Sequence, residues 1–426
     1  MKTRLTFLLV IAATLAAQAA SERDPGYVAH EWGTFTSVQG ADGVQLDWNP
    51  LVLWDLPKFV YDLNAVRSRR PVVVVASKLG MQCRQRMETP VIYFYTESER
   101  TVDVAVTFPE GTITEWYPQE TAADLLLRPA SQMAKRPALN WKGVQLVPPS
   151  SAAGKQLALR LPQDNGTSHY FAARETDAAL VTSSTKGGQS EVEKFLFYRG
   201  VAGFQAPLHV TLEGPACDTL GVMNHGPEPL ASLFVCEVRG GTGRMIAIGD
   251  LDAGSSRTVP LPAGAAFVPL DQLRETLGGQ MRTALTRAGL YPREAAAMVK
   301  TWDAAWFGEP GLRVLYVLPR SWTDRTLPWQ LTPAPRETAR VMVGRAELIT
   351  PAMETALTEA VQRYIGAGEG ERPALVTATR QLGLGRFMEP TLRRVIASAD
   401  RGPKFSALSW ELLQSASQPP KRAASN

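Results

Sequence analysis

The chain has 426 residues, of which 45% are hydrophobic and 20% are charged, a globular composition with enough apolar material for two or three domains. The net charge is only +4, and no basic block is interleaved with aromatic residues, so nucleic acid is excluded as an expected partner. After the N-terminal region no segment is long and apolar enough to span a membrane, so no span is expected in the mature chain.

The N-terminus has the pattern of a secretory signal peptide. Lys2 and Arg4 form a short basic region, and residues 5–16 form an apolar run shorter than the about 20 residues that a membrane span needs. Ala17 and Ala19 fit the small-x-small pattern that precedes a cleavage site. We therefore predict cleavage after Ala19 and an exported mature chain, in the periplasm or outside the cell.

Three cysteines, Cys83, Cys217 and Cys236, bear on the chemistry of an exported chain. In an oxidising compartment Cys217 and Cys236 can close a hairpin-sized loop, which leaves Cys83 as a buried thiol. The alternative, three unpaired cysteines that act as small core residues, fits the sequence equally well. There is no CxxC motif and no Cys/His cluster, so we predict no metal site, and the sequence identifies no cofactor.

The first predicted strand carries a histidine and a glutamate in succession. Residues 27–38 alternate as in a strand, with His30 and Trp32 on one face and Glu31 on the other. His30 and Glu31 can therefore meet in one site only if the strand bulges, which Gly33 would permit. The alternative is a half-buried histidine whose ring bonds to neighbouring backbone.

The central strand of the first half is predicted at residues 84–95, where a polar row leads into an apolar row. Alternation places Arg84, Arg86 and Glu88 on one face, together with the even-numbered apolar residues that follow, such as Ile92. Two arginines on one strand face lie about 7 Å apart. They can bind a carboxylate, sulfate or phosphate through paired hydrogen bonds, with Glu88 holding one of them in place.

A ladder of ion pairs is the alternative use of these charges, with Glu115 or Glu193 on neighbouring strands as partners. Arg199 shares a predicted strand face with Phe195 and Phe197, so its charge must be paired or reach water. Arg199 is either tied to a carboxylate or a third cation of the same pocket, and the sequence leaves both interpretations open.

Residues 101–262 are punctuated by glycine and proline, as in an antiparallel β-sandwich. Residues 101–108 and 112–117 are expected to pair as a hairpin across a Pro-Glu-Gly turn. Residues 129–149 are expected to be rich in loops. Further strands are expected at residues 156–161, 169–173, 192–199, 208–212, 230–238 and 245–248.

Helical periodicity begins beyond residue 262. Helices are expected at residues 271–289 and from Pro292 onward, the second with a wide apolar stripe. A continuous apolar run at residues 312–318 predicts a strand that is buried on both faces. Another strand is expected at residues 339–349.

Arg320 and Asp324 lie in the proline-rich loop predicted after the strand at residues 312–318. Ligands often bind at the carboxyl ends of strands in α/β layers, so one interpretation makes them an acid/base or anion-binding pair. In the other interpretation they form a local salt bridge that fixes the loop.

The remainder of the chain is predicted to be helical. Thr350 is a suitable N-cap for a helix beginning at Pro351, and three or four helices follow as far as Leu413. The tail from Ser415 is expected to be disordered. We therefore predict an α+β protein with a signal peptide at 1–19, a β-rich, sandwich-like domain at 20–262, a mainly helical α+β domain at 263–414 and a tail at 415–426.

Four segments are similar to a family of exported bacterial proteins: HEWGTFTS, RQRMETPVIYFY, TEWYP and RVLYVLPR. The resemblance spans most of the mature chain. It implies export and one shared architecture, and it assigns no activity and no site residues.

Two functions of different classes fit these features. The first is an exported hydrolase or lyase acting on sugar-like or anionic substrates in one concave pocket. Its candidate catalytic residues are Glu88, Glu31 and His30. Its candidate substrate-binding residues are Arg84, Arg86, Arg199, Arg320, Asp324 and Trp32. The second function is non-catalytic binding of a glycan or an envelope protein through an aromatic surface made by Trp48, Trp54, Trp116 and Trp141.

Overall fold

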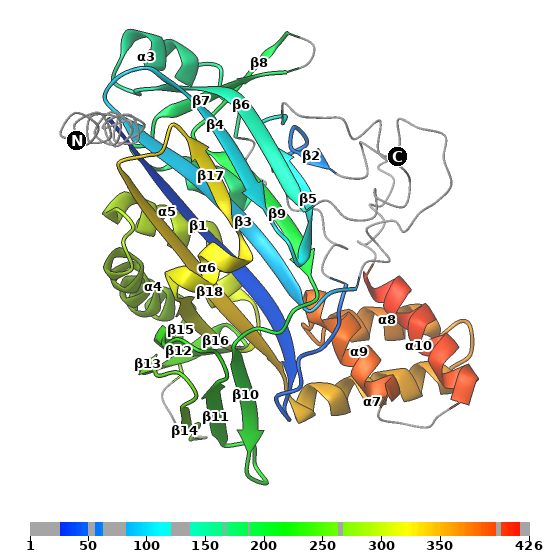
Figure 1. Ribbon diagram of the computed structural model, residues 1–426. Coiled ribbons are helices and arrows are strands. Elements are labelled where there is room, and N and C mark those ends of the chain that lie inside the picture. The colour runs from blue at the N-terminus through cyan, green and yellow to red at the C-terminus, as the bar shows by residue number, and fades with distance from the viewer. Residues whose placement is uncertain are drawn as a thin grey trace, which may run out of the picture.

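Figure 1 shows the computed structural model of the protein. The structure describes residues 26–49, 56–62, 82–120, 137–164, 166, 168–185, 188–262, 267–397 and 402–417. The predicted signal peptide, its cleavage site and Trp54 lie outside the described residues. Within these ranges no helix is long and apolar enough to cross a membrane.

A ten-stranded sheet, the main sheet, forms the centre of the molecule (Figure 1). β1 and β18 pair in parallel, and all other neighbours pair antiparallel. Its strands, in spatial order, are β15 (Val268–Pro269), β13 (Thr242–Leu251), β12 (Leu230–Arg239), β16 (Gly311–Leu318), β18 (Glu337–Ile349), β1 (Tyr27–Gly40), β3 (Gln85–Thr96), β9 (Leu196–Ala202), β5 (Gly111–Tyr117) and β2 (Tyr61–Asp62). Because β16 and β18 lie between β12 and β1, the main sheet joins residues from both sides of the predicted boundary at residue 262.

Two smaller antiparallel sheets accompany the main sheet. The three-stranded sheet consists of β10 (Leu208–Glu213), β11 (Thr219–Asn224) and β14 (Ser256–Pro260). The five-stranded sheet consists of β17 (Trp329–Thr332), β4 (Arg100–Thr107), β6 (Ala138–Val147), β7 (Leu180–Ser184) and β8 (Ser190–Glu193). The protein is therefore α+β with stacked sheets in its β-rich part, which confirms the predicted fold class.

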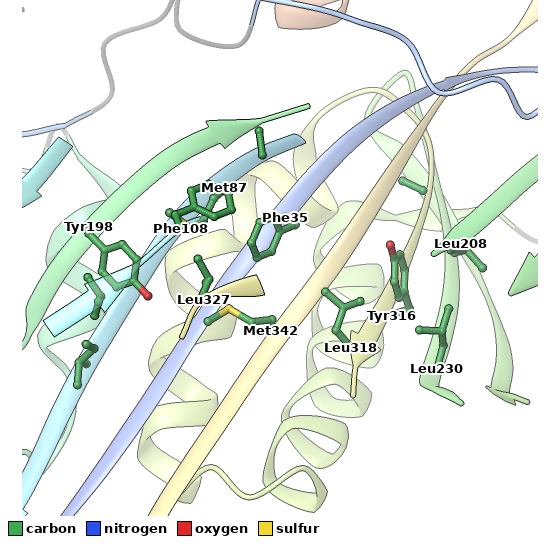
Figure 2. Close-up of a cluster of buried hydrophobic side chains, with 14 of the residues drawn as sticks. Phe35, Met87, Phe108, Tyr198, Leu208, Leu230, Tyr316, Leu318, Leu327 and Met342 are labelled. Atoms are coloured by element: carbon green, nitrogen blue, oxygen red, sulfur yellow. The ribbon is translucent and has the colours of Figure 1, made fainter. Parts of the chain in front are cut away.

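The core between the sheets gathers side chains from distant parts of the chain. Figure 2 shows Phe35 of β1, Met87 of β3 and Met342 of β18 in one apolar cluster with Phe108 and Leu327. Burial of apolar area stabilises a fold by roughly 25 cal/mol per Å². This cluster therefore holds the five-stranded sheet against one face of the main sheet, which we call the sheet face.

Helices cover the opposite face of the main sheet, which we call the helix face. The helices are α4 (Leu270–Arg287), α5 (Pro292–Asp303) and a π-helical turn, η6 (Ala304–Gly308). Pro292 is the first residue of α5, as predicted. The apolar stripe of α5, continued by Trp306 of η6, lies in one buried cluster with strand residues such as Trp32 and Val343. The stripe consists of Ala295, Met298, Val299 and Trp302.

A helical bundle lies beside the ends of β1 and β18 (Figure 1). It contains α7 (Pro351–Gly366), α8 (Arg372–Arg380), the short turn η7 (Gly385–Phe387), α9 (Met388–Ala397) and α10 (Gly402–Ser417). Thr350 caps α7, since its Oγ1 accepts a hydrogen bond from Met353 N at 3.3 Å, and this confirms the predicted helix start. The predicted tail at Ser415 begins inside α10, and residues 418–426 lie outside the described ranges.

The hairpin predicted across residues 109–111 is wrong, although both of its strands exist. β4 belongs to the five-stranded sheet and β5 to the main sheet. The chain passes from one layer to the other at this turn, where Gly111 N donates to Phe108 O at 3.0 Å. Alternation and turn residues identify two strands but do not state whether they pair with each other.

Four segments also differ from the sequence-based predictions. The strands expected at residues 156–161 and 169–173 are the helices α3 (Ala152–Ala158) and η5 (His169–Arg174). The expected loop after Pro319 contains the helix α6 (Arg320–Thr326), and residues 129–149 include β6. Short apolar runs do not distinguish helix from strand, and the caps at Ser151 and Ser168 decide for helix in the first two segments.

A bulge in β3 changes which of its residues share a face. Trp32 lies opposite Val91 and Thr34 opposite Glu88, so the interval in β3 is one residue longer than in β1. A bulge therefore forms beside Gly33, but the extra residue is in β3, where Thr89 has a φ of 43°. Beyond this extra residue, the side chains of β3 point to the opposite faces of the sheet from those that strict alternation predicts.

The predicted face assignment for residues 84–95 is wrong for this reason. Met87 and Ile92 lie together in the core on the sheet face, whereas Val91 lies in the core on the helix face. Arg86 and Glu88, on either side of Met87, therefore share the helix face with Val91 and not with Ile92.

Candidate functional site

Glu31 is buried on the sheet face, and both oxygens of its carboxylate accept hydrogen bonds. Oε2 accepts from Arg340 Nε at 2.8 Å and Nη2 at 2.6 Å, and Oε1 accepts from Tyr198 OH at 2.5 Å. Burial opposes the charge of Arg340, but the Glu31 carboxylate raises the pKa of this guanidinium above its usual value. Glu31 is thus the counterion of a buried cation, and both of its carboxylate oxygens are engaged in hydrogen bonds.

Asp324 and Arg320 extend the buried ion pair into a chain of contacts that reaches the protein surface. Arg340 Nη1 donates to Asp324 Oδ1 at 2.8 Å, and Arg320 Nε lies 3.4 Å from Asp324 Oδ2 within α6. Arg320 Nη1 also donates to Thr338 O at 2.6 Å. The geometry is that of the local salt bridge that the sequence left open.

Arg86 and Glu88 belong to a set of charges buried on the helix face. Glu88 Oε1 accepts from Thr36 Oγ1 at 2.7 Å and from Arg386 Nη1 at 3.0 Å. Arg86 Nε lies 3.5 Å from Glu88 Oε2. Arg386 comes from η7, so the predicted carboxylate binds a cation that the helical bundle supplies.

The same set continues across the neighbouring strands β18 and β16. Glu347 Oε2 accepts from Arg345 Nη2 at 2.8 Å and from Arg313 Nε at 2.9 Å. Glu309, directly after η6, accepts from Arg345 Nη2 at 2.7 Å and lies 3.7 Å from Arg386 Nη2. We call these residues the charged layer: Arg86, Glu88, Glu309, Arg313, Arg345, Glu347 and Arg386.

The remaining predicted cations lie in other pairs. Arg199 Nε donates to Glu115 Oε2 at 2.8 Å across β9 and β5, with both side chains buried. Glu193 instead binds Arg174 at 2.7 Å. Arg84 Nε lies 3.3 Å from Asp47 Oδ1, where both side chains are exposed to solvent. The predicted site residues therefore do not converge in a single hollow.

His30 differs from Glu31 and Glu88 because one of its two ring nitrogens has no hydrogen-bond partner among the described residues. Its Nδ1 lies 2.8 Å from Glu294 Oε2, while Nε2 is buried and has no hydrogen-bond partner among the described residues. The same carboxylate oxygen accepts from Tyr291 N at 2.7 Å. The ring centroids of Tyr291 and Tyr95 lie 4.4 Å and 5.5 Å from that of His30, so two tyrosine rings cover the pair.

Glu294 was not among the site residues predicted from the sequence, although the sequence contains a signal for it. It stands at the third position of α5, after Pro292, where glutamate commonly caps a helix through the backbone N–H at its start. Its second role, holding the His30 imidazole, depends on a contact between positions 264 residues apart.

The predicted aromatic surface is largely inside the protein. Trp48, Trp116 and Trp141 are buried, as is Trp32. A flat surface for stacking on a glycan is therefore not formed by these tryptophans.

The three cysteines are free. Cys236 lies in the core of the helix face, where burial raises the pKa of its thiol to about 11, whereas Cys217 lines a cavity described below. Of the two alternatives left open, the structure has the unpaired cysteines. In the described ranges no group of three or more His, Cys, Asp or Glu side chains is placed to hold a metal ion.

A cavity of about 730 Å³, which we call the seam cavity, lies between the three-stranded sheet, the edge of the main sheet and the start of α7. Arg239, Arg244 and Glu237 line it on the main sheet. Glu237 Oε2 accepts from Arg244 Nε at 2.8 Å, and Oε1 pairs with Arg239. The Phe267 ring lies 5.0 Å from the Arg244 guanidinium carbon. A second cavity of about 360 Å³ shares Arg239 and Thr350 with it.

The arginines of the seam cavity were not among the residues predicted from the sequence. Glu237 and Arg244 are cross-strand neighbours in β12 and β13. A charged pair facing each other on two strands was the signal available, but only the tertiary structure shows that the start of α7 lines the space beside it.

Neither a family model nor a curated protein matches the chain. Among solved structures, the Fcho1 mu-homology domain of Danio rerio with a bound Eps15 peptide gives a TM-score of 0.32 at 6% identity, covering 78% of this chain and 100% of that one. The yeast delta-COP-I mu-homology domain, alone and complexed with a Dsl1 WxWxV peptide, gives 0.27 at 8% identity, covering 76% of this chain and 98% of that one. Scores this low support no argument about function.

Proposed function

We propose that the protein binds an acidic sugar or a similar anionic small molecule in the seam cavity, without catalysis. The observation that carries the proposal is a cavity of about 730 Å³ that Arg239 and Arg244 line, a volume within the about 300–1,000 Å³ common for ligand sites. The site differs from the predicted one, but it serves the predicted class of ligand.

The charges of the cavity favour an anion at its main-sheet side. Arg239 and Arg244 share the single carboxylate of Glu237, and the Arg239 side chain is 72% exposed. Thr350 and Ala352, at the N-terminal end of α7, line the same space. The positive end of a helix dipole adds to the attraction of an anion already held by guanidinium groups.

The opposite side of the cavity supports a ligand that also carries hydroxyl groups. Asp218 and Thr219, at the start of β11, line it there. A carboxylate repels an anion but accepts hydrogen bonds from hydroxyls. The Phe267 ring offers a surface for the apolar face of a sugar ring. Export, as expected from the N-terminus, would place the protein where such sugars occur outside the cytoplasm.

Calorimetric titration of the mature chain tests this proposal. The ligands are glucuronate, glucose 6-phosphate and, as an uncharged comparison, glucose. Arg239→Gln should weaken binding of the two anions at least tenfold. Arg282→Gln, on the exposed side of α4, should leave binding unchanged. Equal binding of glucose, or no effect of Arg239→Gln, would overturn the proposal.

The predicted hydrolase or lyase is the second candidate function, and one observation favours it. A carboxylate that holds Nδ1 of an imidazole leaves Nε2 as a general base, and His30 with Glu294 has this arrangement. Tyr291, whose ring covers the pair, is 38% exposed, so the pair lies one side chain below the surface.

Turnover of nitrophenyl esters and glycosides by the mature chain tests the second candidate. His30→Gln should abolish turnover, and Glu294→Gln should lower kcat while KM changes little, because Glu294 only positions the base. Turnover that survives His30→Gln would remove this candidate.

A further inference from the structure

Two arginines of the charged layer have N–H donors without an acceptor among the described residues. The Arg345 side chain is 1% exposed, and its Nη1 has no hydrogen-bond partner in the part of the chain that the structure describes. The Arg386 side chain is 10% exposed, and the same holds for its Nε and Nη2. A buried donor without an acceptor costs about 1–3 kcal/mol, and more when it is charged. These atoms therefore attract an acceptor.

The two guanidinium groups face the same small region. Their central carbons lie 5.2 Å and 5.1 Å from the centroid of the Phe387 ring. Arg345 Nη2 and Arg386 Nη2 lie 2.7 Å and 3.7 Å from a single oxygen, Glu309 Oε2. One group is carried by β18 and the other by η7, so an anion between them would join the main sheet to the helical bundle.

Glu309 has the most exposed side chain of the charged layer. Its side chain is 39% exposed, whereas Glu88 and Glu347 are almost completely buried. Burial opposes its ionisation, but Arg345 and Arg386 hold the pKa of Glu309 below its usual value. Glu309 therefore occupies the region as a carboxylate, and its exposure lets it move toward solvent.

Among the described residues, the charged layer contains one more cation than anions. Its seven members are four arginines and three glutamates. Guanidinium groups bind carboxylates and phosphates through parallel pairs of N–H donors. A small oxyanion supplies several acceptor oxygens at once, which one carboxylate oxygen of Glu309 does not.

From this geometry we infer an anion site between Arg345 and Arg386, in which a small oxyanion such as phosphate or sulfate displaces the Glu309 carboxylate. The bound oxyanion accepts from the unused guanidinium donors and links η7 to the main sheet. The site shares no residue with the seam cavity, so it neither requires nor tests the function proposed there.

The test measures the midpoint of thermal unfolding and the Kd for phosphate at constant ionic strength, with chloride as the reference salt. Phosphate should raise the midpoint of the full mature chain. Glu309→Gln removes the competing charge, so it should tighten phosphate binding at least tenfold. Tighter phosphate binding by Glu309→Gln distinguishes a ligand site from a purely structural ion pair. In a purely structural ion pair, Glu309→Gln would only destabilise the fold, with or without phosphate.

Arg386→Gln should abolish the response to phosphate, whereas Arg282→Gln, on the exposed side of α4, should leave it intact. If Arg386→Gln does not fold, Arg386→Lys keeps the charge, loses the paired donors and should weaken phosphate binding at least tenfold. A midpoint that responds equally to phosphate and chloride, or a Glu309→Gln protein that binds phosphate no better than the native chain, would overturn the inference.

Discussion

Glu31 and Arg340 stand opposite each other on the parallel strands β1 and β18 and form an ion pair through two guanidinium nitrogens, at 2.8 Å and 2.6 Å. Both side chains are fully buried. The pair therefore lies at the centre of the main sheet, where residues 309 positions apart in the chain meet.

Removing one member of this pair should be costly. Glu31→Gln leaves the buried Arg340 guanidinium with only the half-exposed Asp324 carboxylate as a counterion, and we expect a loss of up to about 3–5 kcal/mol in the free energy of unfolding. Urea denaturation measures the loss. The exposed partner Arg320 provides the control, since Arg320→Gln should change stability by about 0.5 kcal/mol or less.

A double variant separates the destabilisation caused by an unpaired buried charge from the contribution of the ion pair to the free energy of unfolding. Glu31→Leu combined with Arg340→Met replaces both charges by apolar groups, and it should be less destabilised than Glu31→Gln. A double variant less stable than Glu31→Gln would show that the pair itself contributes most of the stability.

Gly33 should tolerate no side chain. A Cβ at this position would lie 3.0 Å from the backbone Cα of Pro90 and 3.0 Å from Met342 Sδ. Because the bulge brings backbone against Gly33, Gly33→Ala should lower the free energy of unfolding by about 1–3 kcal/mol. Gly203→Ala is the matched control, since nothing lies within 4 Å of a Cβ there, and equal effects of the two substitutions would contradict the expectation.

The pH dependence of stability should carry a contribution from Glu309. The pKa of this carboxyl is lowered in the folded protein from 4.5, so the folded state binds fewer protons there than the unfolded state does. The stabilisation is therefore complete above pH 4.5 and is lost as the pH falls through the folded-state pKa.

Urea unfolding of the native chain and of Glu309→Gln, without phosphate or sulfate, measures this contribution. The native chain should be the more stable of the two at pH 7, and the difference should shrink as the pH falls below about 4.5. A difference that is constant from pH 7 to pH 3 would show that the Glu309 charge is not involved.

His30 should become chemically reactive when its cover is removed. Diethyl pyrocarbonate modifies imidazole nitrogens that carry a lone pair, and Glu294 holds Nδ1, which leaves Nε2. In the native chain the Tyr291 ring covers His30. We expect the His30 peptide to be unmodified in the native chain and modified in Tyr291→Ala, as measured by mass spectrometry.

His225 is the internal control for this experiment, because it is exposed and should react in both proteins. A His30 peptide that stays unmodified in Tyr291→Ala, while His225 reacts, would mean that Nε2 is not reachable. The acid/base interpretation of His30 would then lose its support.

Much of the secondary structure was predictable because its causes are local. The starts of α5 and α7 follow from Pro292 and from Thr350 with Pro351, since caps involve residues within one turn. The buried strand β16 follows from a continuous apolar run. Pairing was not predictable at residues 109–111, where two well-formed strands enter different sheets.

The candidate sites show the same division more sharply. The sequence indicated Arg86, Glu88 and His30 as polar residues in apolar strands, and all three are buried in the structure. It could not name their partners Arg386 and Glu294, which are 298 and 264 positions away. The predicted strand face of Arg86 and Glu88 was also wrong. A single extra residue in β3 moves every later side chain of that strand to the opposite face of the sheet.

Composition, caps and apolar periodicity were therefore sufficient for an α+β chain and for most of its elements, because each of these signals acts over a few neighbouring residues. Ion pairs, cavities and the covered imidazole arose only when elements distant in the chain packed together. The energy of a buried charge depends on the groups that surround it in space. Which groups these are cannot be derived from the order of residues along the chain alone.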